Sequence, residues 1–429
     1  MARTPLDSIA FGLYHILWTA SIPFLRHNHR LAEGYNQRCL KHQHLCQADL
    51  WIQCASAGEA YLAWEILKKI ARGRPLRILV TTNTSQGMGI LEQIESDLKK
   101  SYDRLTIQRA YFPFDSPAIM KRAVRLVRPR LMVLLETELW PGLLSSLKRA
   151  GCPIVVINGR MTRRSLDRYM IWPAFWRRQR PDNVLAISAT DKAHFTALFG
   201  SRGVAGMPNI KFDRLREDDT PSDSLPSFAD GRQALDKFLV LGSVRKAEEE
   251  DVMAIIQRVL DRQPDAVIGL FPRHMHRITH WQQTLQRLGI SWRLRSKHQT
   301  VETGGVILWD VFGELGFAYP LAIAAFVGGS LARLGGQNFL EPLVRGVPTV
   351  IGPSWENFKW IGTQIIDQEI LQQADSWKDV ADFLIARIMS PVDRDALKKE
   401  AQQYIKDRQG GTLIACALIR KHLDPLPRS

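Results

Sequence analysis

Two series of short apolar segments, separated by one polar stretch, constrain the fold of this 429-residue chain more than any other feature. In each series the apolar segments alternate with amphipathic helical patterns. The segments are apolar throughout rather than at every second residue, which is typical of parallel strands covered by helices on both faces. The expected strands are Leu50–Cys54, Arg77–Thr81, Leu131–Leu135, Ile154–Ile157 and Val184–Ile187, then Phe238–Leu241, Ala266–Phe271, Val306–Trp309, Ala325–Val327 and Thr349–Ile351.

The polar stretch Arg214–Asp230 is rich in Ser, Pro and Asp and reads as an interdomain linker. The chain is therefore predicted to form two doubly wound α/β domains, with helices such as Ala60–Ile70 and Pro117–Arg125 and a last helical segment, Arg394–His422. Ligands of such domains bind beyond the carboxyl ends of the strands, so these ends should face a cleft between the domains. Neither domain has a P-loop or a clean dinucleotide fingerprint, which disfavours an ATPase and a dehydrogenase.

The N-terminal segment Ile9–Leu25 carries no formal charge, and the basic residues Arg26 and Arg30 come directly after it. It is slightly shorter than the roughly 20 apolar residues that span a bilayer, and Pro23 would strain its last turn. Two interpretations stay open: a membrane-embedded or interfacial anchor, which is favoured, and a buried core helix. Basic residues after the segment indicate that the chain beyond it is cytoplasmic.

The charge and cysteine content narrow the class of partner. The chain has 58 Lys and Arg against 43 Asp and Glu, a formal net charge of +15, which favours anionic partners. Five scattered cysteines suggest no disulfide framework and fit a reducing compartment. Cys39, His42, His44 and Cys46 are crowded and lack a distant second half, so no metal site is predicted.

Carboxylates follow two expected strands of the first domain. Glu59 comes shortly after Leu50–Cys54 and would open a helix, where it is either a general base or a capping acid. Glu136 and Glu138 follow Leu131–Leu135, where carboxylates are costly unless they react or pair with nearby arginines. Lys211, just before the linker, is either a solvated charge or an anion ligand at the hinge.

The second domain has glycines and one arginine at its expected strand ends. Arg273 could clamp a phosphate with its fork of donors. The glycines of Phe326–Ser330 and Gly335–Gly336 permit close approach of a ligand and could present amide donors to a phosphate. Asn338–Glu341 opens a helix whose N-terminus favours an anion, and Glu341 suits ribose hydroxyls. This combination is a moderately specific nucleotide-sugar signature.

Taken together and in this order, these motifs resemble the Kdo transferases, bacterial enzymes that transfer 3-deoxy-D-manno-oct-2-ulosonic acid (Kdo) to the lipid A precursor in lipopolysaccharide biosynthesis. The resemblance covers about residues 9 to 420, and Glu136–Pro141 and Phe326–Ser330 match the family pattern as they stand. Departures occur at Gln337, where the family has histidine, and in Gly242–Glu250, which lacks a histidine and a glycine of the pattern.

The resemblance implies a GT-B fold with two Rossmann-like domains, a CMP-Kdo donor, and neither cofactor nor metal. It makes Glu59 the general base, Glu136 and Lys211 the groups that steady the transition state, and Glu138 a less secure supporting partner. The residues that would hold CMP are Pro272, Arg273, Phe312, Gly313, Glu314, Asn338, Phe339, Leu340 and Glu341.

The expected domain plan has five parts. They are an anchor or interfacial helix (1–30), an acceptor-binding domain (31–213), a linker (214–235), a CMP-sugar-binding domain (236–392) and a C-terminal helical segment (393–429). The expected partners are CMP-Kdo, the lipid A precursor lipid IVA and the anionic cytoplasmic face of the inner membrane, to which Arg26, Arg30, Arg38 and Lys41 would contribute. The alternatives are a GT-B enzyme that uses another nucleotide sugar on a lipid acceptor and, less favoured because no binding motif supports it, a basic nucleic-acid-binding protein.

Overall fold

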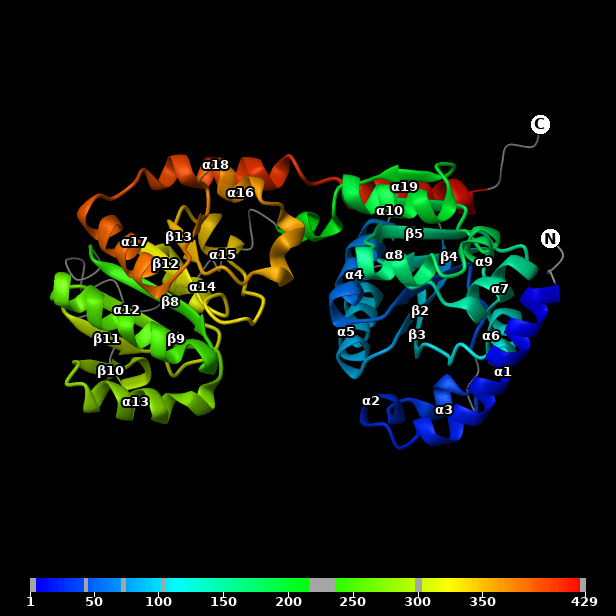
Figure 1. The fold of residues 1–429 in the computed structure, drawn as a ribbon, viewed down its shortest axis with the longest axis horizontal. Helices are drawn as coiled ribbons and strands as arrows, with labels where there is room; N and C mark the ends of the chain where they lie inside the picture. The colour runs from blue at the N-terminus through cyan, green and yellow to red at the C-terminus, as the bar shows by residue number, and fades with distance from the viewer. Residues whose placement is uncertain are drawn as a thin grey trace. The chain divides into compact units, whose positions relative to one another are not determined.

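The computed structural model describes residues 5–41, 45–70, 75–101, 105–215, 236–297 and 303–424. The chain divides into two compact units, one formed by Met1–Arg214 with Arg408–Ser429 and the other by Leu215–Asp407. Apart from its first two residues, the expected linker 214–235 lies outside the described residues. Each unit is an α/β domain built on a parallel sheet (Figure 1).

In the first unit the described strands form a parallel sheet with the order β3-β2-β1-β4-β5-β6-β7. The strands are β1 (Leu50–Cys54), β2 (Leu76–Thr82), β3 (Leu105–Tyr111), β4 (Leu131–Leu135), β5 (Ile154–Gly159), β6 (Asn183–Ala186) and β7 (Val204–Gly206). Every residue of β1, β4 and β5 is buried, because helices cover both faces of the sheet.

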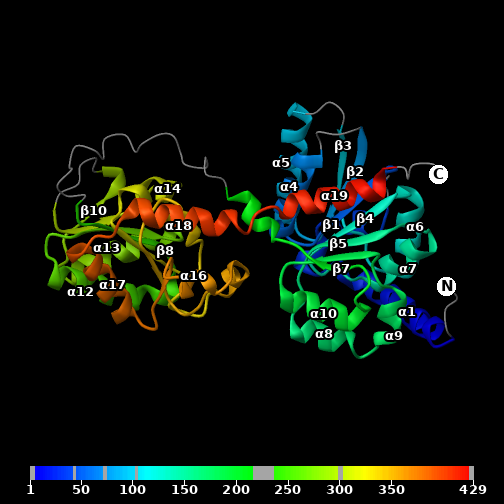
Figure 2. The same ribbon diagram turned by 90° about the horizontal axis from the view of Figure 1, so that it is seen from above.

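Helices lie on both faces of this sheet (Figures 1 and 2). Two separate cores of buried side chains pack beneath them. One core includes helices α4 (Ala57–Ile70), α5 (Ser85–Ser101) and α19 (Gly411–Leu423). The other includes helices α1 (Pro5–Leu25), α6 (Pro117–Val127), α7 (Pro141–Arg149), α8 (Arg163–Tyr169), α9 (Pro173–Arg178) and α10 (Ala189–Phe199). The short helices α2 (His29–Ala32) and α3 (Tyr35–Arg38) come after α1.

In the second unit the described strands form another parallel sheet, with the order β10-β11-β9-β8-β12-β13-β14. The strands are β8 (Phe238–Val244), β9 (Val267–Pro272), β10 (Trp292–Leu294), β11 (Gly305–Leu308), β12 (Ala324–Val327), β13 (Thr349–Ile351) and β14 (Gln372–Gln373). The helices are α12 (Glu249–Arg262), α13 (Ile278–Arg287), α14 (Leu315–Ala318), α15 (Leu340–Leu343), α16 (Gln364–Asp367), α17 (Trp377–Met389) and α18 (Arg394–Lys406).

The prediction of two doubly wound parallel-sheet domains is confirmed. The predicted helical segment Arg394–His422 is divided into α18 and α19 at Gly410, whose φ of 105° is accessible mainly to glycine. Asp213 accepts hydrogen bonds from the backbone N–H groups of Gly410 and Thr412, and this contact holds the start of α19 in the first unit.

Helix α1 is packed on one side and exposed on the other. Phe11 is buried, with its ring centroid 5.7 Å from that of Phe175 in α9, whereas Leu13 and Leu17 are 58% and 65% exposed. Within the described parts of the chain, no helix combines the length and apolarity needed to cross a membrane. The expected contribution of Arg38 to a membrane surface is wrong, because its guanidinium is buried and donates to the backbone oxygens of Asn83 and Phe112.

Candidate active site

The first sheet reverses its strand order between β1 and β4, and the candidate carboxylates come after these two strands. Glu59 lies after β1, and Glu136 and Glu138 lie after β4. Adjacent parallel strands that continue in opposite directions leave a crevice beyond their carboxyl ends, which is where doubly wound domains bind ligands. The topology therefore brings all three carboxylates to one edge of the sheet.

Glu59 lies in the first turn of α4 and is 7% exposed. Its carboxylate accepts hydrogen bonds from the backbone N–H of Ala55 (2.6 Å) and from the Ser56 hydroxyl (3.0 Å), so the capping contact is present. Burial, reinforced by the charges of Glu138 and Glu136, nevertheless raises the pKa of Glu59 to about 8. A carboxyl group that titrates near neutral pH is suited to proton transfer, so capping and a chemical role are compatible.

Glu136 pairs with Lys211, whose Nζ lies 3.2 Å from the Glu136 Oε1. Asn158 at the end of β5 supports this pair, because its buried side-chain oxygen accepts from the backbone N–H of Ile210. Glu136 and Asn158 both have left-handed backbone conformations, with φ of 56° and 58°. Such strained residues are concentrated at functional sites. The motifs of the sequence did not point to Asn158, although its position after a buried strand is a usable signal.

Glu138 accepts a hydrogen bond from the indole N–H of Trp140 at 2.7 Å. Burial raises the pKa of Glu138, and hydrogen bonds from Trp140 and Gln53 partly oppose this effect. Gln53 is buried in β1 and accepts from the Thr81 hydroxyl at 2.6 Å. The alternative in which nearby arginines pair with Glu136 and Glu138 is wrong. Among the described residues, Lys211 pairs with Glu136 and Trp140 donates to Glu138.

In the second unit a buried carboxylate within Gly242–Glu250, to which the sequence motifs assigned no role, organises the glycine loop. Glu248 is buried and accepts from the backbone N–H groups of Arg245 (2.9 Å), Gly329, Ser330 (3.2 Å) and Leu331 (3.3 Å). It thereby ties the segment after β8 to the segment after β12. Glu248 belongs to the acidic run Glu248–Asp251, a pattern typical of the solvent-exposed first turn of a helix. Its burial and its contacts with the glycine loop could therefore not be predicted from the sequence.

The expectation that the glycine amides bind phosphate is wrong for most of these amides. The N–H groups of Gly329, Ser330 and Leu331 donate to Glu248. The Gly336 N–H donates to the Gly329 carbonyl at 2.7 Å, and the Gly335 N–H donates to the Ser354 hydroxyl at 2.9 Å. These five N–H groups hold the loops together instead.

The expected donor residues lie beyond the carboxyl ends of β9, β11 and β12. Pro272 ends β9, and Arg273 comes next with an exposed side chain. Phe312 is 78% exposed, and Glu314 accepts from the Trp309 indole (2.8 Å) and pairs with Arg295 (3.1 Å). Gly313, next to Phe312, has a φ of 91°.

The remaining expected donor residues surround α15. Phe339 and Leu340 are buried, so their side chains belong to the core and only their backbone could meet a ligand. Asn338 is exposed, and Glu341 is half-buried with its pKa raised by burial and partly restored by Arg345. Helix α15 has four residues, too few for the expected effect of a helix N-terminus on an anion.

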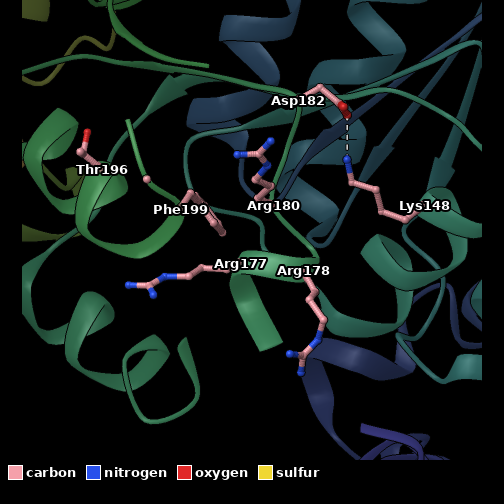
Figure 3. Close-up of a pocket in the computed structure, with 8 residues that line it drawn as sticks. Lys148, Arg177, Arg178, Arg180, Asp182, Thr196 and Phe199 are labelled. Atoms are coloured by element: carbon pink, nitrogen blue, oxygen red, sulfur yellow. Dashed lines mark hydrogen bonds and ion pairs between the residues drawn. The ribbon is translucent and has the colours of Figure 1, made fainter. Parts of the chain in front are cut away.

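A basic cavity lies at the opposite edge of the first sheet, near the starts of β5 to β7 (Figure 3). It has a volume of about 620 Å³. Its lining comprises Lys148, Arg177, Arg178, Arg180, Asp182, Thr196, Phe199 and Gly200. The Lys148 Nζ lies 3.0 Å from Asp182, and the three guanidinium groups point in different directions (Figure 3). Because the guanidinium groups do not converge on one point, the cavity contributes positive charge to this face of the unit but is not shaped to bind one small anion.

Among the described residues, no group of three or more His, Cys, Asp or Glu side chains is placed to hold a metal ion. His42 and His44 of the crowded Cys–His segment lie outside the described residues.

Replacement of Gly328 by alanine should destabilise the second unit by about 1 to 3 kcal/mol, the usual cost of overpacking. A Cβ at this position would lie 2.6 Å from the Glu248 carboxylate and 2.9 Å from the Ser243 carbonyl. The matched control is Gly89→Ala in α5, where a Cβ meets no atom within 4 Å and should stabilise by roughly 0.5 to 1 kcal/mol. Denaturant unfolding of both variants measures this, and equal stabilities would contradict the packing argument.

Comparison with known proteins identifies the family of the chain. The family described as 3-deoxy-D-manno-octulosonic-acid transferase (kdotransferase) matches residues 26–214. The 3-deoxy-D-manno-octulosonic acid transferase of Bordetella pertussis is 29% identical over 376 residues, covering 85% of each chain. That of Chlamydophila psittaci is 30% identical over 309 residues, covering 71% of this chain and 69% of the relative.

Solved structures support the fold alone. The crystal structure of UDP-N-acetylglucosamine 2-epimerase has a TM-score of 0.55 at 12% identity, covering 88% of this chain and 97% of that chain. The glycotransferase of kitacinnamycin has a TM-score of 0.51 at 12% identity, covering 88% of this chain and all of that chain. The family match and the sequence relatives, by contrast, show that the chain belongs to the 3-deoxy-D-manno-octulosonic acid transferase family.

Proposed function

We propose that this family member transfers Kdo from CMP-Kdo to lipid IVA, the lipid A precursor, without a metal ion. Residues 31–213 would bind the acceptor, residues 236–392 the CMP-sugar, residues 214–235 would link them, and residues 393–429 would form the helical end of the chain. The observation that carries the proposal is the cluster at the switch point of the first sheet. There a buried carboxyl group with a pKa of about 8, Glu59, shares one edge with the Glu136–Lys211 pair.

In the proposed reaction Glu59 takes the proton of the acceptor hydroxyl as the hydroxyl oxygen attacks the anomeric carbon of Kdo. The bond from that carbon to the CMP phosphate oxygen breaks, and CMP leaves with the electron pair. Lys211, held by Glu136 at 3.2 Å, would offset negative charge in the transition state. Arg273 would hold the CMP phosphate with a fork of donors, and Glu341 would accept from ribose hydroxyls.

Replacement of Glu59 by glutamine should lower turnover by about two to four orders of magnitude, because the amide cannot accept a proton. In the wild type kcat/KM should rise with pH up to about 8 and level off above it, because Glu59 acts only when deprotonated. The variant should lose this dependence. Radiolabelled Kdo transfer across a pH series measures both effects.

The control for this experiment is Glu65→Gln in the same helix, which removes a carboxylate paired with Lys68 at 3.3 Å and should leave the pH profile unchanged. Near-wild-type turnover of Glu59→Gln with an intact profile would restrict Glu59 to its capping contact.

Replacement of Arg273 by lysine should raise the KM for CMP-Kdo by about tenfold and leave the KM for the lipid acceptor unchanged, because one point charge replaces a two-pronged contact. Arg287→Lys, at an exposed position in the last turn of α13, is the matched control. An equal rise of the KM values for both substrates would mean that Arg273 supports the fold rather than donor binding.

A second measurement tests the identity of the donor nucleotide. If the donor is CMP-Kdo, CMP should raise the melting temperature of the protein, whereas UDP and GDP, the nucleotides of other GT-B donors, should not.

We further propose that the enzyme lies on the cytoplasmic face of the inner membrane through the exposed side of α1. The apolar side chains of Leu13 and Leu17 are open to solvent, and Arg177 and Arg178 in α9 contribute basic charge to the same unit. An interfacial helix with nearby cations binds anionic lipid by apolar burial and charge together.

The double variant Leu13→Ser/Leu17→Ser should lower sedimentation with anionic vesicles at high salt by about tenfold or more, since less apolar surface is buried in the lipid. The control is Leu413→Ser/Ile414→Ser, a pair of exposed apolar residues in α19. Sedimentation of the α1 variant equal to that of the control would exclude α1 as the membrane contact.

A further inference from the structure

Asp115 is a buried carboxylate that the proposed reaction does not use. We propose that Asp115 and Tyr14 form a positioning link through which α1 holds the Glu136–Glu138 loop in its reactive arrangement. The inference rests on the proposed function, because it assigns the link to that same site. Asp115 is buried and Tyr14 acts through it, so both are positioning residues.

Three hydrogen bonds converge on Asp115, which is 2% exposed and lies in the segment after β3. Its Oδ2 accepts from the Tyr14 hydroxyl of α1 (2.9 Å) and from the backbone N–H of Gly142 (2.7 Å). Its Oδ1 accepts from the backbone N–H of Leu143 (2.7 Å). Asp115 thus joins α1 to the first turn of α7, two elements far apart in the sequence.

Helix α7 depends on this distant carboxylate for its N-terminal cap. The residue at its own N-cap position, Trp140, makes no side-chain hydrogen bond to the helix start. The first N–H groups of a helix need an acceptor from outside the helix ladder, and Asp115 supplies it from another loop. Close packing fixes the same contact, because a Cβ on Gly142 would lie 2.5 Å from the Asp115 carbonyl oxygen.

The start of α7 in turn contacts Glu138 through Trp140. Trp140 directly precedes α7, packs against Phe112 at 6.1 Å between ring centroids, and donates its indole N–H to Glu138 at 2.7 Å. The charge of Glu138 acts on Glu59. A shift of α7 would therefore move Trp140, loosen Glu138 and alter the environment of Glu59.

Aromatic contacts give α1 a firm hold on the segment that carries Asp115. Trp18 of α1 lies 5.7 Å from Phe114, and Tyr35 of α3 lies 5.9 Å from the same ring, in both cases between ring centroids. The Tyr35 hydroxyl donates to the carbonyl of Ile22 near the end of α1. The helix proposed to meet the membrane is therefore linked to the Glu136–Glu138 loop through Asp115 and the start of α7.

The test is Tyr14→Phe in the full-length protein, which removes one hydroxyl and keeps the ring in place. Thr19→Ala is the matched control, because it removes the hydrogen bond from Thr19 to the His15 carbonyl within α1 without reaching Asp115. The readouts are kcat, the two KM values, the pH profile, and hydrogen exchange of the amides in 136–145.

Tyr14→Phe should lower kcat by about tenfold, displace the pH profile that reports Glu59, and speed exchange at Gly142 and Leu143. The KM for CMP-Kdo should stay unchanged, and Thr19→Ala should match the wild type in every readout. Asp115→Asn, which keeps an acceptor oxygen but loses the charge, should give a smaller effect in the same direction than Asp115→Ala.

Unchanged amide exchange in 136–145 and unchanged kcat in Tyr14→Phe would overturn the link. Losses of the same size in Thr19→Ala would also overturn it, because they would reflect the general stability of α1. The exchange measurement does not depend on Kdo transfer, so it tests the link even where Glu59→Gln contradicts the proposed reaction. If the amides exchange faster in Tyr14→Phe while Glu59→Gln keeps full activity, the link stands and only the catalytic role of Glu59 is refuted.

Discussion

Buried carboxylates that accept from backbone N–H groups at the carboxyl edges of the sheets hold this structure's loops in place. Glu59, Asp115 and Glu248 each make such contacts, and two of them join segments far apart in the sequence. A buried carboxylate without donors would cost several kcal/mol, so each loop must keep the shape that supplies its donors. The buried carboxylate stabilises the conformation of its loop, and the loop supplies the donors that make burial of the carboxylate affordable in free energy. The candidate site residues on these loops depend on both.

The same hydrogen bonds determine which of the buried carboxyl groups, Glu59 or Asp115, could take part in proton transfer. Burial raises the pKa of Glu59 to about 8 and that of Asp115 to about 7 despite their hydrogen bonds. Asp115 is surrounded by its tyrosine and two helix N–H groups, which leaves it no chemical task. Glu59 has one backbone donor and one hydroxyl donor and lies within the field of Glu138, so it can exchange a proton. The surroundings of the two carboxyl groups therefore differ although both are buried, and only those of Glu59 suit the proposed role as a base.

The sequence predicted the central strands better than the edges, for a physical reason. Strands β1, β4 and β13 match their predicted ranges because they are buried on both faces and read as continuous apolar runs. Strands β3 and β14 carry polar residues, such as Gln108 and Gln372, and sit at the edges of their sheets, where that pattern fails. Among the candidate site residues, Glu59 and Glu136 could be proposed from the sequence because they come after buried strands. Asp115 and Glu248 were missed because only tertiary contacts reveal them.

Three of the six described non-glycine residues with a positive φ lie at the carboxyl ends of strands, close to the buried carboxylates in the sequence or in space. Glu136, Asn158 and Ser243 have φ of 56°, 58° and 59°, and they lie at the carboxyl ends of β4, β5 and β8. For residues with a Cβ this conformation is unfavourable, so surrounding contacts must hold it. The Lys211 ion pair holds Glu136, and the Ile210 N–H holds Asn158. In the second unit the Ser243 carbonyl lies so close to Gly328 that only glycine fits there. Strain, tight packing and buried acids therefore coincide at the edges where doubly wound sheets bind ligands.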